Sequence, residues 1–153
     1  MSFVVSLRRC SKGQSGFTLV EILVVILIVG ILAAIAIPAF LSQKSKAYDS
    51  SAKTLAQTAQ TAMEAYAAEN NGEYTGATKA KLKKLEPSIN TTDGNEAKLE
   101  ATKVSAKEYT VTAVAANTGD KYSIKRSSNG ELEHTCTSKD HGCPGHANSS
   151  SGW

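Results

Sequence analysis

Hydrophobic residues fill a long stretch near the start of the chain and then thin out into a helical pattern. From Phe17 to Ile37 the single charged side chain is Glu21. A run of this length is long enough to cross a bilayer as a helix. The sequence therefore predicts a membrane-spanning helix over residues 17–38.

The helical pattern continues beyond this apolar run. Between residues 49 and 69 apolar side chains recur with a helical period and form one stripe. The stripe consists of Ala52, Leu55, Ala56, Ala59, Ala62, Met63, Tyr66 and Ala67, and the opposite side carries Ser51, Lys53, Thr54, Thr58, Thr61 and Glu64. Asn70, Asn71 and Gly72 tolerate the left-handed backbone that ends a helix. We predict one helix from Phe17 to about Asn70.

Pro38 lies in the middle of this predicted helix. Proline lacks an N–H and its ring clashes with the preceding turn, so it either kinks a helix or ends it. Helical signals resume directly after Pro38, which favours a kink.

The remainder of the chain is predicted to form a short helix and a small sheet. A short helix is expected over residues 77–85, because Pro87 stops it. Three strand-like runs follow at 108–116, 121–127 and 131–138, with turns rich in Asn and Gly between them. A three- to four-stranded antiparallel sheet packed on the apolar stripe would close a core. The expected fold class is α+β. Both faces of the first run are partly apolar, so its facing stays open.

Charge is concentrated before the apolar run. Arg8, Arg9 and Lys12 account for three of the 17 cations, which leaves 14 cations against 14 acids in the rest of the chain. This balance offers no basic surface for nucleic acid. Cations on the N-terminal side predict that this end stays in the cytoplasm, although Lys44 and Lys46 on the far side weaken the bias.

Four lysines crowd the predicted short helix: Lys79, Lys81, Lys83 and Lys84. We expect them to form a solvated face, with a binding patch as the alternative.

A secretory signal peptide is an alternative interpretation of the N-terminal region. It too has a basic start, an apolar stretch and small residues at the cut, and Ala34-x-Ala36 fits such a cut. Against it, the run is longer than an ordinary signal core, contains an acid and passes directly into a helical pattern.

Glu21 allows two interpretations. A carboxylate inside hydrocarbon is costly and is usually paired and functional. Near the start of a helix the helix dipole favours negative charge. This explains why the Glu21 carboxylate is tolerated, but it supplies no charged partner for it. If the chain is cut between Gly16 and Phe17, the new ammonium at Phe17 lies one helical turn from Glu21. That amine could pair with its own Glu21 or with Glu21 of a neighbouring copy.

The segment GFTLVEILVVILIVGILAAIAIPAF resembles the N-terminal region of type IV pilins and of the related pseudopilins of type II secretion, over roughly residues 8–42. The resemblance implies that prepilin peptidase cuts between Gly16 and Phe17 and N-methylates Phe17. It also implies that Glu21 neutralises the N-terminus of an adjacent subunit. Gly30 and Pro38 fall where these proteins have a helix-loosening glycine and a kinking proline.

This resemblance implies a domain organisation and a life cycle. Residues 1–16 would be a cleaved leader, 17–38 a transmembrane and assembly helix, and 39–153 a pilin globular domain. The subunit would start as a single-pass inner-membrane protein in lipid. Membrane assembly machinery would then draw it into a homopolymeric filament outside the cytoplasm.

Two cysteines remain after the leader. An even pair outside the cytoplasm, Cys136 and Cys143, suggests a disulfide closing a short loop, which also resembles the C-terminal loop of pilins. The alternatives are free thiols or a zinc site, because His134, His141 and His146 lie among the cysteines. The ligand spacing fits no reliable zinc pattern, so we expect no metal. We also expect that the Trp153 side chain can dock on the globular domain.

No catalytic signature is present, so we expect a non-enzyme without cofactor or small-molecule substrate. The predicted function is a structural pilin. Alternatives are a type II secretion pseudopilin, a minor pilin of a DNA-uptake system, or, from a different class, a membrane-anchored binding domain.

Overall fold

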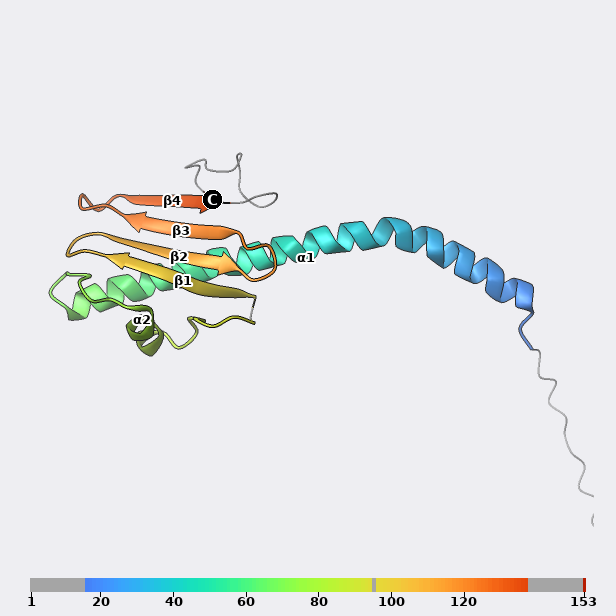
Figure 1. Ribbon diagram of the computed structural model, residues 1–153, viewed down its shortest axis with the longest axis horizontal. Helices are drawn as coiled ribbons and strands as arrows, with labels where there is room; N and C mark the ends of the chain where they lie inside the picture. The colour runs from blue at the N-terminus through green and yellow to red at the C-terminus, as the bar shows by residue number, and fades with distance from the viewer. Residues whose placement is uncertain (1–15, 95, 138–152) are drawn as a thin grey trace, which may run out of the picture. The chain divides into compact units, whose positions relative to one another are not determined.

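The computed structural model describes residues 16–94, 96–137 and 153. Its elements in chain order are α1 (Leu19–Glu69), α2 (Lys79–Leu85), β1 (Ala97–Val104), β2 (Tyr109–Ala115), β3 (Lys121–Arg126) and β4 (Leu132–Thr137) (Figure 1). The chain divides into two compact units, Met1–Ala39 and Phe40–Trp153. The long helix and the small antiparallel sheet confirm the predicted α+β fold class.

Helix α1 passes through Pro38 and ends where the sequence predicts. Asn71 and Gly72 adopt positive φ angles of 56° and 81°, and the Gly72 N–H donates to the Ala67 carbonyl at 2.7 Å. Pro38 therefore does not end the helix, and the kink at this residue stays a prediction.

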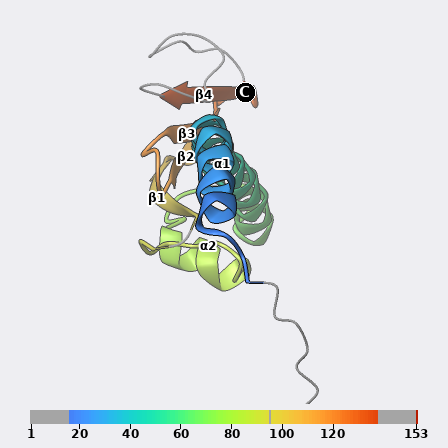
Figure 2. The same cartoon turned by 90° about the vertical axis from the view of Figure 1, so that its right-hand side faces the viewer.

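The predicted apolar stripe of α1 is confirmed as one wall of the core. All eight of its members are buried, and five of them are alanines. The opposite wall is the inner face of the sheet, which contributes Leu99, Tyr109, Val111, Ala113, Ala115, Tyr122 and Ile124. Figure 2 shows the sheet lying along one side of the C-terminal half of α1.

The sheet has the order β1-β2-β3-β4, and every neighbouring pair is antiparallel. The three predicted strands correspond to β2, β3 and β4. The facing of β2, which the sequence left open, places Tyr109 and Val111 inward. Thr112 lies on the other face, where its Oγ1 is 2.8 Å from Ser123 Oγ.

Strand β1 was not predicted, although the expected three to four strands allowed for it. Its register on β2 shifts between Leu99 and Ala101, as in a β-bulge. The segment gave no strand signal, because Ala, Lys and Glu, which are depleted in strands, make up five of its eight residues.

Helix α2 confirms the predicted short helix, and Thr78 caps it by accepting from the Lys81 N–H. Lys81, Lys83 and Lys84 are exposed as expected. Three of the four lysines are also anchored: Lys79 donates to the Glu100 carbonyl, Lys81 to the Tyr66 hydroxyl and Lys83 to the Ile89 carbonyl, at 2.9, 3.2 and 3.1 Å. These contacts fasten α2 to its neighbours.

Candidate functional site: an exposed apolar helix

The first turn of α1 is defined by Thr18. Its Oγ1 accepts from the Glu21 N–H at 3.2 Å, and its carbonyl accepts from the Ile22 N–H at 3.3 Å. A threonine in this position caps a helix by satisfying an otherwise unpaired backbone donor. Glu21 therefore lies in the first turn, where the helix dipole favours its negative charge.

The Glu21 carboxylate is exposed, and within residues 16–94, 96–137 and 153 no side chain pairs with it. Gly16 and Phe17 lie just before α1, and both are exposed. This placement fits an accessible peptide bond between them. The cut and the N-methylation of Phe17 stay predictions.

The first half of α1 is apolar and uncovered. Its large hydrophobic side chains from Phe17 to Leu41 are 46–80% exposed. By length and composition, α1 is the one helix in the described part of the chain that could cross a membrane, and the mean hydropathy of its most apolar window is 3.2. Such a surface needs lipid or other protein around it.

A shallow groove of about 520 Å³ runs along this apolar helix at Gly30. It is lined by Leu23, Ile26, Leu27, Gly30, Ile31 and Ala34. A Cβ placed on Gly30 would meet no atom within 4 Å, so the floor of the groove is open. A glycine flanked by large apolar side chains gives another helix room for close approach.

The globular unit carries polar contacts that hold its own fold together. Glu64 accepts from the hydroxyls of Tyr74 and Tyr109 at 2.9 Å each and from Arg126 Nη1 at 3.2 Å. Burial, followed by the Glu64 hydrogen bond, raises the pKa of both tyrosines. The sequence placed Glu64 on the polar side of the helix and gave no signal for these contacts, which join α1 to β2 and β3.

A second polar contact buries Asp49, whose side chain was not singled out in the sequence. Asp49 is 2% exposed, and its Oδ1 accepts from Thr118 Oγ1 at 2.9 Å. Its Oδ2 has no hydrogen-bond partner within the part of the chain that the structure describes. Burial raises the pKa of Asp49 above its ordinary 3.8, and nearby Asp120 adds to the rise, while Thr118 and Lys53 oppose it.

We expect Asp49→Asn to raise the melting temperature of the chain at neutral pH. Because the raised pKa favours the protonated carboxyl in the folded state, ionised Asp49 weakens folding at neutral pH. As pH falls through the folded pKa toward 3.8, the wild type gains a proton and the difference should shrink. Melting temperatures of the wild type and of Asp49→Asn, measured from neutral pH down to about pH 3.8, test this expectation.

Asp93→Asn is the matched control for that measurement, because the Asp93 side chain is 86% exposed in its pair with Lys98. Exposed pairs contribute little to stability, so its melting temperature should stay near that of the wild type. An Asp49→Asn protein that melts lower at neutral pH would contradict the expectation.

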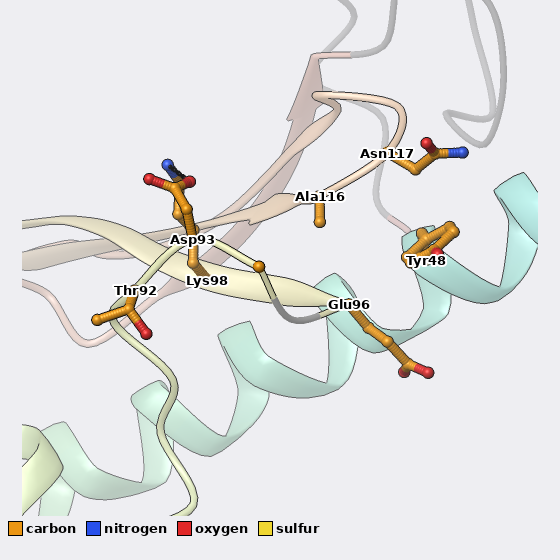
Figure 3. Close-up of a pocket in the computed structure, with 8 residues that line it drawn as sticks. Tyr48, Thr92, Asp93, Glu96, Lys98, Ala116 and Asn117 are labelled. Atoms are coloured by element: carbon orange, nitrogen blue, oxygen red, sulfur yellow. Dashed lines mark hydrogen bonds and ion pairs between the residues drawn. The ribbon is translucent and has the colours of Figure 1, made fainter.

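The globular unit has a wide, open depression of about 550 Å³. Figure 3 shows Tyr48 and Asn117 on one side of it and Asp93 and Lys98 on the other. Asp93 pairs with Lys98, and Glu96 accepts from Ser51 Oγ at 2.7 Å. The described lining residues include no histidine or cysteine.

The C-terminal cysteines are only partly within the described residues. Cys136 is buried in β4 opposite Tyr122, whereas Cys143 lies outside, so their disulfide stays a prediction. His141 and His146 also lie outside. Within residues 16–94, 96–137 and 153 no group of three metal-ligating side chains gathers.

Trp153 docks on the sheet, as the sequence allowed. Its Nε1 donates to the Thr135 carbonyl at 3.1 Å, and its ring lies 5.6 Å from Tyr122 and 4.9 Å from His134, measured between ring centroids.

Comparison with known proteins finds similarity in the N-terminal part of the chain. Residues 11–37 match the prokaryotic N-terminal methylation motif. The chain is 46% identical over 63 residues to a fimbrial protein of Neisseria meningitidis serogroup B, covering 41% of this chain and 36% of that protein. It is 43% identical over 63 residues to the type IV major pilin protein PilA of Myxococcus xanthus, covering 41% and 29%. It is 41% identical over 60 residues to the type II secretion system core protein G of Aeromonas hydrophila, covering 39% and 42%.

These matches confirm the resemblance to type IV pilins and pseudopilins. The matched stretch spans less than half the length of each of these relatives. No solved structure matches the chain.

Proposed function

We propose that this chain, whose N-terminal segment is that of type IV pilins and pseudopilins, is a structural subunit that polymerises into a type IV pilus-like surface filament. The observation that carries the proposal is the capped, apolar first half of α1, whose large hydrophobic side chains are exposed and whose first turn carries one carboxylate. The matched methylation motif, residues 11–37, overlaps this first half of α1. The chain acts by assembly and not as an enzyme.

Processing would prepare the subunit for assembly. Prepilin peptidase removes the leader, residues 1–16, between Gly16 and Phe17, and Phe17 is then N-methylated. Residues 17–38 serve as the transmembrane and assembly helix, and residues 39–153 as the globular domain. Before assembly the N-terminus is cytoplasmic and the apolar helix spans the inner membrane.

Assembly would transfer the apolar helix from lipid into a bundle of its own copies, with the help of an inner-membrane machine. In the finished filament outside the membrane, burial of this apolar surface away from water between copies supplies most of the cohesion, at about 25 cal/mol per Å². The Glu21 carboxylate pairs with the Phe17 amine of a neighbour and sets the register. Gly30 and Pro38 loosen and kink the helix, and a Cys136–Cys143 disulfide closes the C-terminal loop.

A pseudopilin of a type II secretion system is the second candidate, favoured by the 41% identity to core protein G of Aeromonas hydrophila. The predicted processing and N-terminal assembly are the same for both candidates. They differ in the length and location of the filament.

Mass spectrometry of the mature chain tests the first step of the proposal, which is leader removal and methylation of Phe17. A chain beginning with methylated Phe17 supports it. An intact leader would indicate a membrane-anchored binding domain, and a cut after Ala36 would indicate a secreted protein. Electron microscopy of the cell surface would then distinguish abundant pili from a short envelope filament.

A further inference from the structure

The two edges of the sheet, β1 and β4, are covered in different ways. At the β1 edge the Leu99 N–H donates to the Asn90 carbonyl at 2.7 Å, and Asn90 Nδ2 donates to the Ala97 carbonyl at 2.7 Å. The Glu100 carbonyl accepts from Lys79 Nζ at 2.9 Å. An open edge offers its backbone groups to any other strand, so contacts of this kind protect β1 from unwanted pairing.

At the β4 edge (Figure 1), the cover found among the described residues is the side chain of Trp153. Its Nε1 donates to the Thr135 carbonyl at 3.1 Å. Its ring centroid lies 5.6 Å from that of Tyr122, 4.9 Å from that of His134 and 5.9 Å from Lys53 Nζ of α1. Trp153 therefore contacts the edge of β4, the inner face of the sheet and the long helix together.

The contact with Trp153 identifies the backbone groups of β4 that face away from β3. Along an antiparallel strand, the N–H and C=O groups of every second residue face the same side. Since the Thr135 carbonyl faces outward, the backbone groups of Glu133 and Thr137 do so as well. Within residues 16–94, 96–137 and 153, the Thr135 carbonyl is the one outward group of these three residues that has a partner. The edge therefore retains donors and acceptors for another strand.

A second copy of β4 fits this edge in charge. If two copies pair antiparallel about Thr135, each Thr135 lies opposite its counterpart and Glu133 lies opposite Thr137. Because Glu133 is the one acid of β4 and the strand contains no Lys or Arg, no like charges lie opposite each other. The acid then lies between Lys125 of its own β3 and Lys121 on β3 of the other copy, two strands or about 10 Å away.

We propose that the edge of β4 is a pairing surface for β4 of a second copy, and that Trp153 is its removable cover. Each copy uses the same residues, so the contact is two-fold and joins two four-stranded sheets into one. Trp153 must leave the Thr135 carbonyl when the strands pair, because that acceptor enters the new ladder. All these residues belong to the globular unit, so the inference does not depend on filament assembly.

Removal of the cover tests the surface. In detergent we expect the wild-type full-length chain to be monomeric and Trp153→Ala to have twice its protein mass, measured by size-exclusion chromatography with light scattering. Non-reducing gels should show no covalent dimer. Met63→Ala is the control, because it weakens the core but leaves Trp153 and β4 unchanged, and it should stay monomeric. A monomer or a heterogeneous aggregate from Trp153→Ala, or equal association of Met63→Ala, would overturn the proposal.

A charge exchange at Thr135 tests the two-fold register. In the Trp153→Ala chain, Thr135→Lys alone or Thr135→Glu alone should give monomers, because two like charges would lie opposite each other. An equal mixture of the two charged chains should restore the doubled mass. Thr110→Glu, on the inner strand β2, is the matched control and should leave the doubled mass of Trp153→Ala unchanged. Association of either charged chain alone, or a monomeric mixture, would contradict the pairing of β4 with itself.

Discussion

Replacing Glu21 with alanine should leave a chain that enters the membrane but yields almost no filament. The substitution removes the one charge from the apolar run, so insertion into lipid becomes easier. It also removes the only acid of the first turn of α1, and the Phe17 amine of a neighbour would then be desolvated without a partner. Immunoblots of the sheared filament fraction and of the membrane fraction measure both effects.

Glu21→Gln and Glu69→Ala are the controls for this loss. Glutamine keeps the shape but not the charge, so it should also assemble poorly. Glu69 is exposed at the end of α1, and its loss should leave filament yield unchanged. Normal yield from Glu21→Ala would remove the charge-pairing role from the assembly mechanism.

Met63→Ala should destabilise the globular unit by about 2–5 kcal/mol, because it opens a cavity between helix and sheet. Met63 is fully buried in the stripe of α1, which packs on the sheet. For a unit of this size the melting temperature should fall by on the order of 10 °C. Thermal unfolding of the detergent-solubilised chain, followed by circular dichroism, measures the shift.

Thr61→Ala is the matched control on the same helix. Thr61 is exposed, and its Oγ1 donates to the Gln57 carbonyl of its own helix at 3.1 Å. Thr61→Ala should therefore change the free energy of unfolding only a little. Equal destabilisation by the two substitutions would contradict the assigned core.

The helical part of the fold could be predicted from the sequence because it depends on local periodicity. The eight stripe residues recur with the helical period, and all eight are buried. The helix stop at Asn71 and Gly72 could also be predicted, since it depends on their tolerance of positive φ.

The rest depends on contacts between residues far apart in the chain. Strand β1 was missed because Ala, Lys and Glu, which are depleted in strands, make up five of its eight residues, and its strand structure depends on pairing with β2. The partners of Glu64 lie 10 to 62 residues away. The burial of Asp49 depends on the turn that carries Thr118, which lies 69 residues further along the chain. No local sequence pattern predicts this burial.

The candidate site likewise has features that the sequence alone predicts and one that only the structure shows. Glu21 and the apolar run are visible as an acid within a hydrophobic stretch, and the methylation motif matches there. The Thr18 cap could not be predicted from the sequence alone. It depends on a backbone geometry that brings Thr18 Oγ1 within reach of the Glu21 N–H.

The anchored amines of α2 have a practical consequence for labelling. Amine-reactive dyes react most readily with exposed amines that are not held in hydrogen bonds, and Lys79, Lys81 and Lys83 each donate to a neighbouring oxygen. Lys84, on the same short helix, is exposed. A fluorophore attached at limiting reagent would therefore tag Lys84 ahead of its three neighbours, which offers a way to mark the globular unit while leaving the fastening of α2 intact.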